Sequence, residues 1–136
     1  MIDKEIIKIA SNTENHGTLS NHTHSSKLKN VICGDEMKIY LIVKDDKIKD
    51  FRYECESCIY CQAAVSLLSR NAKNKSVEKV KNFAKLAKNS FEKNTKFFEK
   101  EWKEFDKIMT KNNISRKECL LLPVNTTLDA LNKKSL

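Results

Sequence analysis

Three cysteines within residues 54–61 mark a point where an extended segment ends and a helix begins at once. Upstream, the side chains of residues 48–55 alternate in character with a period of two, which predicts a strand. Downstream, residues 59–68 are mostly apolar and predict a helix that is buried against the sheet and ends near residues 70–71. A helix beginning just after Cys58 places this thiol at its amino terminus, where free amide hydrogens and the helix dipole favour the thiolate. The fold must therefore pass directly from a strand through a turn into a helix, with the three thiols at this junction.

A second strand is predicted just before the first. Residues 37–44 also alternate, and Asp45-Asp46-Lys47 suits a hairpin turn although it lacks the usual glycine. The hairpin returns the chain to Cys33-Gly34-Asp35, so this tripeptide and residues 54–61 are expected at the same end of the sheet. Cys119 lies just ahead of the last apolar helix. The sequence therefore predicts one site of the size of a metal ion, surrounded by Cys33, Asp35, Cys58 and Cys119.

The rest of the pattern is mainly helical. Apolar spacing predicts a short helix over residues 2–10 and a helix over residues 77–87 capped by Ser76. A further helix over residues 98–109 carries an aromatic stripe, which is ordinarily core. Its members are Phe98, Trp102, Phe105 and Met109.

The final helix, from residue 115, is strongly apolar and carries the only proline, Pro123, near its start, where a helix tolerates it. No repeat or change of composition divides the chain. One α+β domain over residues 1–136 is expected.

Residues 12–30 are polar and carry all three histidines, and we expect a loop with at most one edge strand. His22 and His24 could lie on one side of such a strand, a geometry that a metal ion accepts. An exposed polar loop is the more common role for such a pair, so we do not count it among the expected ligands.

Lys and Arg outnumber Asp and Glu by 26 to 18, which gives a formal net charge of +8. This charge permits attraction to phosphates, acidic proteins or anionic lipid. The lysines of residues 73–111 are nevertheless mixed with Glu and Asn, without the aromatic interleaving of a nucleic-acid surface. We expect a solvated helical surface and no nucleic-acid partner.

The amino terminus lacks the continuous apolar core of a secretory signal, and no run approaches the roughly 18 apolar residues that span a bilayer. A soluble, cytoplasmic protein without a membrane partner is expected. Cellular reductants keep thiols free there, so the five cysteines favour metal binding or sulfur chemistry over disulfides.

The spacing Cys55-x2-Cys58-x2-Cys61 is similar to that of a ferredoxin cluster loop, but no fourth cysteine follows within reach. The chain also lacks the two well-spaced cysteine pairs of a zinc ribbon. Free thiols that pack as small hydrophobes are the favoured interpretation of Cys55 and Cys61. That interpretation fits Cys33, Cys58 and Cys119 less well, because each lies at the edge of an element beside polar residues.

Three features occur in a characteristic order: Cys33-Gly34-Asp35 before an alternating strand, Cys58 at a helix start, and Arg116-x2-Cys119-x2-Leu122 before an apolar helix. Together they resemble the U-type iron–sulfur cluster assembly scaffolds, namely the NifU amino-terminal domain, IscU and SufU. The resemblance covers nearly the whole chain. It implies an IscU/SufU-like α+β fold with a small antiparallel sheet of about three strands packed against four to six helices.

The resemblance also implies roles for particular residues. Cys33, Cys58 and Cys119 are the implied thiolate ligands, and Asp35 is the carboxylate that ligates the metal or controls cluster release. The implied cofactor is a zinc ion or a transient [2Fe–2S] cluster. The implied partners are a cysteine desulfurase that delivers persulfide sulfur and the recipient apo-proteins or a downstream carrier. The implied state is a monomer or weak dimer.

The long segment between Cys58 and Cys119, and Glu118 in place of a histidine, resemble the SufU-type branch more than IscU. In a SufU-type protein Cys33 is the implied persulfide acceptor, and in an IscU-type protein Cys119. Arg116 matches a basic position of the family and could pair with Asp35 when no metal is bound.

Departures from the family are also present. Cys55 and Ser57 stand where glycines are usual, and the chaperone-recognition motif of IscU-type proteins is absent before Cys119. Cys61 replaces a residue that is commonly small and polar, so it could be a spare ligand or a second persulfide carrier.

Three functions are therefore open. The first is a scaffold that accepts sulfur and relays a transient cluster, and the second is a zinc-bound sulfurtransferase partner of the desulfurase; neither is an enzyme in the usual sense. The third is a non-catalytic, metal-stabilised interaction module whose basic helices bind an acidic protein.

Overall fold

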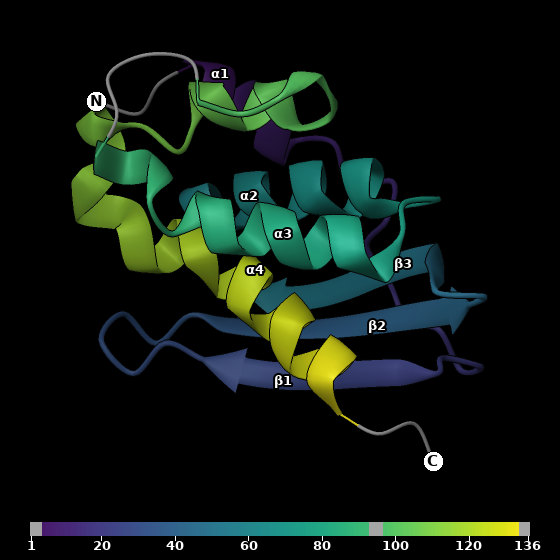
Figure 1. The fold of residues 1–136 in the computed structure, drawn as a ribbon. Helices are drawn as coiled ribbons and strands as arrows, with labels where there is room; N and C mark the ends of the chain where they lie inside the picture. The colour runs from purple at the N-terminus through teal and green to yellow at the C-terminus, as the bar shows by residue number, and fades with distance from the viewer. Residues whose placement is uncertain (1–3, 93–96, 134–136) are drawn as a thin grey trace.

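The computed structural model describes residues 4–92 and 97–133 of the chain. A three-stranded antiparallel sheet in the order β1-β2-β3 packs against helices, which confirms the expected α+β fold (Figure 1). The strands are β1 (His24–Lys29), β2 (Glu36–Lys44) and β3 (Lys47–Glu56). The α-helices are α1 (Lys4–Ala10), α2 (Ile59–Ala72), α3 (Val77–Ala87) and α4 (Lys117–Asn132), and three 3₁₀ helices are η1 (Ser90–Glu92), η2 (Lys100–Lys107) and η3 (Lys111–Arg116). Residues 2 and 3 of the predicted first helix lie outside the described residues.

The β2–β3 hairpin turns at Asp45 and Asp46, whose φ angles are 53° and 61°. Both are left-handed, a conformation that the short polar side chain of aspartate tolerates and that a tight hairpin turn requires. This explains how the turn forms without glycine. The hairpin brings Cys55 opposite Met37. The end of β3 therefore lies beside the start of β2, and the β1–β2 loop and the starts of α2 and α4 meet at that end of the sheet (Figure 1).

The core lies between one face of the sheet and the helices. Met37, Ile39 and Leu41 of β2 are fully buried beneath them. Helix α4 crosses β1 and β2, and α2 covers β3 and packs against α4 and α1 (Figure 1). Most of α2 is buried, which is why its sequence is apolar on nearly every side. The positions of α2 and α4 on the sheet are thus fixed by one continuous core.

The aromatic stripe is buried as predicted, but the single helix predicted for residues 98–109 is wrong. The chain forms the 3₁₀ helix η2 instead, with Phe98 before it and Met109 after it. In a 3₁₀ helix residues three apart share a face, so Trp102 and Phe105 both reach Phe83, with ring centroids 4.3 and 4.6 Å away. Asp106 closes the segment by accepting bonds from the backbone N–H of Phe98 and its neighbour at position 97.

Pro123 lies in the second turn of α4, not in the first turn where a helix tolerates proline. Because proline has no N–H, the carbonyl of Cys119 lacks its usual helical donor. The hydroxyls of Thr126 and Thr127 donate to the carbonyls of Leu122 and Pro123, at 2.7 and 2.8 Å. Such bonds from threonine to the preceding turn also favour helix bending. The helix is therefore weakened just after Cys119.

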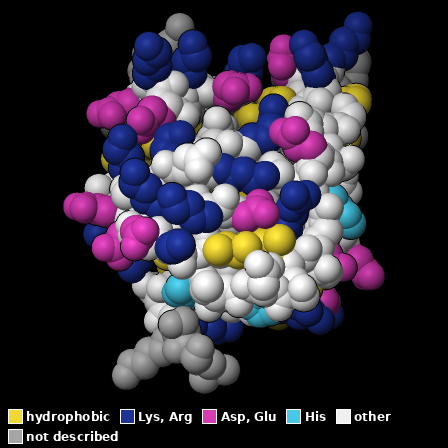
Figure 2. Space-filling model, turned by 90° about the vertical axis from the view of Figure 1, so that its right-hand side faces the viewer, with side chains coloured by type: hydrophobic (Ala, Val, Ile, Leu, Met, Phe, Trp, Pro, Cys, Tyr) yellow, Lys and Arg dark blue, Asp and Glu magenta, His cyan; other side chains and the backbone are white. Residues whose placement is uncertain are grey.

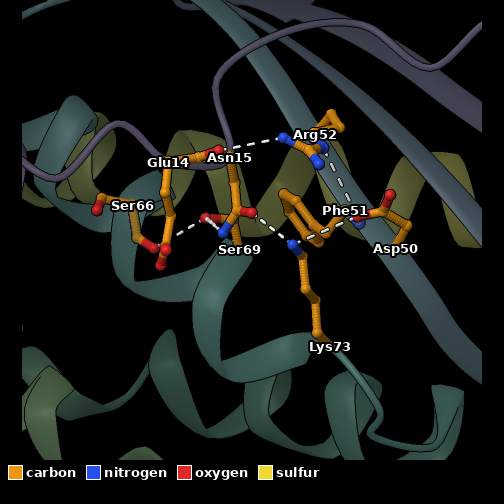
Figure 3. Close-up of polar contacts among 8 residues, drawn as sticks. All are labelled: Glu14, Asn15, Asp50, Phe51, Arg52, Ser66, Ser69 and Lys73. Carbon is orange, nitrogen blue, oxygen red and sulfur yellow. Dashed lines mark hydrogen bonds and ion pairs between the residues drawn. The ribbon is translucent and has the colours of Figure 1, made fainter.

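A polar network fastens the segment before β1 to the sheet and to α2 (Figure 3). The side-chain amide of Asn15 donates to Ser69 Oγ at 3.1 Å and accepts from Lys73 Nζ. Lys73 also lies 3.4 Å from the Asp50 carboxylate, and Arg52 donates to the carbonyl of Glu14. The backbone of residues 15–17 in turn pairs with Tyr53. This pairing covers the β3 edge of the sheet.

The end of the molecule that carries the hairpin turn has mixed charge. On this face Lys and Arg side chains are interspersed with Asp and Glu, around a small hydrophobic patch (Figure 2). Positive charge is therefore not segregated into one continuous area on this face. Within the described residues, no helix is both long and apolar enough to cross a membrane.

Candidate metal centre

The β1–β2 loop is held in a tight shape by its own backbone. The N–H of Asn30 donates to the carbonyl of Asp35, and the N–H of Gly34 donates to the carbonyl of Asn30, both at 2.7 Å. The Asn30 side chain accepts a third bond, from the N–H of Ile32. Gly34 has a φ of 79°, a left-handed conformation that glycine adopts without strain. The loop therefore holds Cys33 and Asp35 in fixed positions at the end of the sheet.

Helix α4 brings the third residue to this loop. The sulfur atoms of Cys33 and Cys119 are 3.8 Å apart. One ligand atom from each of Cys33, Asp35 and Cys119 lies within 4.8 Å of the other two. Cys33 is exposed, whereas Asp35 and Cys119 are buried. Within the described residues this is the single group of at least three possible metal ligands that lie so close together.

The Asp35 carboxylate has one satisfied oxygen and one unsatisfied oxygen. Oδ1 accepts a hydrogen bond from the backbone N–H of Cys58 at 3.2 Å. Oδ2 is buried and has no hydrogen-bond partner in the described structure. Leaving a buried acceptor unpaired costs about 1–3 kcal/mol, more when it is charged. A cation at this position would compensate that cost.

Cys58 is the N-cap residue of α2, as the sequence predicts, and has extended backbone angles. Its backbone N–H donates a hydrogen bond to Asp35, and its thiol lies close enough to Cys119 to raise the pKa of that thiol. It does not belong to the set of ligand atoms within 4.8 Å of one another. All four predicted residues are thus at one end of the sheet, with three of them in the close group.

Burial raises the pKa of the Cys119 thiol, and the neighbouring thiols of Cys58 and Cys33 raise this pKa further. Crowded sulfur atoms cannot all carry negative charge without a counter-ion. A bound metal cation reverses this effect, because it stabilises coordinated thiolates. The arrangement is therefore unfavourable for free thiolates and favourable for metal-bound ones.

The sequence leaves the roles of Cys55 and Cys61 open. Cys61 is fully buried in α2, and burial raises the pKa of its thiol. Cys55 is half-buried on β3, and burial raises the pKa of its thiol as well. Neither belongs to the close group of ligand atoms.

Arg116 is exposed, and its guanidinium carbon lies 5.1 Å from the centre of the Tyr60 ring. In the described part of the chain it forms no ion pair with Asp35. Sequence reasoning missed both Tyr60 as the partner of Arg116 and Asn30 as the residue that closes the loop. Asn30 could have been recognised, because asparagine commonly bonds the backbone two residues onward in turns.

The histidine pair does not join a metal group in the described residues. His22 Nδ1 lies 2.6 Å from the carbonyl of Leu19, and its ring lies 5.4 Å from that of Tyr40. His24 begins β1 and contacts the Thr23 hydroxyl. The edge strand expected in this segment is thus β1.

The donor set fits one tetrahedral metal centre. With metal–sulfur bonds of about 2.3 Å, two thiolates on one tetrahedral ion lie about 3.8 Å apart. The sulfur atoms of Cys33 and Cys119 have this separation. Thiolates suit zinc and iron–sulfur sites, and one harder carboxylate makes the set less tightly binding. Cys33, Asp35 and Cys119 would hold the ion.

Comparison with known proteins gives consistent matches. Residues 1–95 match the family model described as the NifU-like N-terminal domain. The chain is 29% identical over 136 residues to the iron–sulfur cluster assembly scaffold protein IscU of Thermotoga maritima, which covers 99% of this chain and 95% of that protein.

Two solved structures share the fold. An N-terminal NifU-like protein from Brucella abortus has a TM-score of 0.87 at 21% identity and covers 95% of this chain and 90% of its own. A protein described as a scaffold for the SUF system of Fervidobacterium islandicum AW-1 has a TM-score of 0.87 at 26% identity, covering 96% of each chain. Because the family model spans 95 of the 136 residues, this chain belongs to the NifU-like N-terminal domain family.

Proposed function

We propose that this protein is an iron–sulfur cluster assembly scaffold that accepts persulfide sulfur from a cysteine desulfurase and relays a transient cluster to apo-proteins. The observation that carries the proposal is the juxtaposition of Cys33, Asp35 and Cys119 with an unpaired, buried carboxylate oxygen. The names of the similar Thermotoga and Fervidobacterium proteins, both scaffolds for iron–sulfur cluster assembly, support it.

Cys33 is the proposed sulfur acceptor, because it is the exposed thiol of the group. Its thiolate attacks the outer sulfur of the desulfurase persulfide. A new sulfur–sulfur bond forms at Cys33, the sulfur–sulfur bond of the donor breaks, and the donor cysteine leaves as a thiolate. No net oxidation occurs. The Cys33 sulfur lies within 4.8 Å of ligand atoms of Asp35 and Cys119, where the sulfur and iron of the cargo cluster would be assembled.

A zinc-bound, SufU-type sulfurtransferase partner is the second candidate. The separation of 3.8 Å between the sulfur atoms of Cys33 and Cys119 is compatible with it, because two thiolates on one tetrahedral zinc have this spacing. The bound ion would supply charge that stabilises the ligand thiolates. The same spacing also fits two thiolates on one iron of a cluster. The metal and sulfide content of the purified protein therefore has to distinguish the two candidates.

Elemental analysis of protein purified without oxygen tests both candidates. Iron with matching acid-labile sulfide supports the cluster scaffold, and near-stoichiometric zinc supports the sulfurtransferase partner. Cys58→Ser should lose most of either metal. Cys61→Ser is the matched control and should leave metal content unchanged, since Cys61 is fully buried in α2, whereas Cys58 donates its backbone N–H to Asp35 and has its thiol beside Cys119.

Sulfur transfer is tested separately. After treatment with a desulfurase and cysteine, mass spectrometry should find persulfide on Cys33, and Cys33→Ser should abolish it. If no cysteine acquires sulfur, the acceptor mechanism is wrong. If Asp35→Ala changes stability alone and leaves sulfur acceptance intact, the third function, a metal-stabilised interaction module, becomes the better account.

A further inference from the structure

The tip of the β1–β2 loop exposes two large apolar side chains next to the acceptor thiol. Val31 and Ile32 are 89% and 85% exposed, whereas the next most exposed large hydrophobic residue in the described structure, Ile114, is 49% exposed. Each β-branched side chain leaves almost its whole apolar surface in water. Exposed apolar residues that are clustered, rather than scattered singly, mark interaction surfaces.

The loop holds these side chains in a defined position. Three hydrogen bonds to or from Asn30 close it, with partners Ile32, Gly34 and Asp35. The exposure therefore does not come from a loose chain that could fold back onto the core. An anchor that is already ordered loses little conformational entropy on binding, which favours affinity. The loop has the properties of a rigid, projecting anchor.

The position of the tip indicates what binds to it. Cys33 follows Ile32 directly, is exposed, and lies 3.8 Å from Cys119. A protein that brings a sulfur atom to Cys33 meets the same exposed loop that carries Val31 and Ile32. A small sulfur donor would gain nothing from two apolar side chains beside the thiol, whereas a protein with an apolar recess would bury them.

The charge beside the tip is mixed. The strand that leads into the loop carries exposed Lys27 and Lys29. Lys27 pairs with Glu36 at 2.7 Å, and Lys29 lies opposite Glu36 in the sheet. At the start of α4, exposed Arg116 is followed two residues later by exposed Glu118. The two apolar side chains, and not charge of one sign, therefore distinguish this surface, and a complementary partner offers an apolar recess.

We propose that Val31 and Ile32 form the docking anchor for the sulfur-donating protein, a desulfurase whose persulfide-bearing cysteine lies beside an apolar recess. This inference rests on the proposed function. It assigns a role to two residues that are not metal ligands. It also explains why the chain keeps costly apolar surface next to its exposed thiol.

The test uses a Val31→Ser/Ile32→Ser double variant of the full chain and the purified desulfurase. The dissociation constant should rise about tenfold or more, as expected when a buried anchor is removed. Persulfide transfer should slow at low desulfurase concentration and recover at saturation. Sulfur acceptance from a small inorganic polysulfide should be unchanged, because Cys33 itself is intact.

Leu86→Ser is the matched control, because Leu86 is 46% exposed on α3 and lies outside the loop. It should leave the affinity for the desulfurase unchanged. Equal affinity of the double variant and the wild type would overturn this inference while leaving the proposed function standing. A wild-type chain that neither binds the desulfurase nor accepts its sulfur would overturn both. A wild-type dimer that the double variant converts to a monomer, without loss of desulfurase affinity, would assign the anchor to self-association instead and overturn the inference.

Discussion

The sulfur atoms of Cys33 and Cys119 lie 3.8 Å apart although the two cysteines are 86 positions apart in the sequence. Cys33 belongs to a short loop closed by backbone hydrogen bonds, and Cys119 belongs to the first turn of a helix that packs on the sheet. Their proximity therefore depends on the docking of α4 and not on any local motif. It gives the metal-free protein a specific chemical vulnerability.

Mild oxidation of the metal-free protein should join Cys33 and Cys119. The two sulfur atoms have to close from 3.8 Å to the distance of about 2.05 Å in a disulfide, a change that a rotation of the exposed Cys33 side chain would supply. With diamide as oxidant, the two thiols lose two electrons and two protons and diamide is reduced. Peptide mapping should find the Cys33–Cys119 crosslink, and prior zinc loading should prevent it. A map dominated by Cys61 would contradict this, since Cys61 is fully buried.

Asp35→Asn should separate metal binding from stability. The amide oxygen can still accept the bond from the Cys58 N–H, but the negative charge beside the thiols is lost. Zinc affinity, measured by competition with a chelator, should fall about tenfold or more. The free energy of unfolding of the metal-free protein should stay the same or rise by about 1 kcal/mol, because a buried unpaired charge is removed.

Asp106→Asn is the matched control for that variant. Asp106 accepts backbone bonds from residues 97 and 98, far from the thiols in the sequence. Asparagine keeps the Oδ1 acceptor but loses the negative charge that strengthens these bonds, so stability should fall and zinc affinity should stay unchanged. If both variants lost stability to the same extent and both kept zinc, the Asp35 carboxylate would have a purely structural role.

The metal-free, reduced protein should lose stability as the pH rises above about 8.5. Burial raises the pKa of the Cys61 thiol, so the folded state keeps this proton while the unfolded chain releases it near pH 8.5. Stability is thus fully present below that pH and falls above it, by up to about 1.4 kcal/mol per pH unit for this one group. Urea unfolding should show a shallower decline for Cys61→Ala, and parallel curves for the two proteins would exclude this contribution.

Pro123→Ala should stabilise the protein. The alanine N–H restores a donor to the carbonyl of Cys119, while the loss of a few buried ring atoms offsets part of the gain. A net increase of about 1 kcal/mol or more in the free energy of unfolding is expected. Val124→Ala removes buried volume without adding a donor and should lower stability by about 2 kcal/mol. A lower denaturation midpoint for Pro123→Ala would show that the bend is needed for packing.

The helices and strands can be predicted from the sequence where they depend on interactions between residues that are close in the chain. The alternating pattern predicts β2 and β3, Ser76 caps α3 through a bond from Lys79 N–H, and Cys58 starts α2. Where the local signal was ambiguous the prediction failed. Aromatic spacing of three and four residues fits an α-helix, but the chain forms the 3₁₀ helix η2, because packing on Phe83 outweighs the weak preference of a short segment.

What the sequence determined by itself was the set of candidate ligands and the end of the sheet to which the hairpin returns. Only the tertiary structure decided that Cys119 meets Cys33, that one oxygen of Asp35 is buried without a partner, and that Arg116 lies over Tyr60 and does not pair with Asp35. It also decided that Val31 and Ile32 point outward from a closed loop. These relationships join segments that are distant in sequence. They are set by how α4 packs on the sheet, and burial of apolar surface, which drives that packing, is non-directional and leaves no local signature.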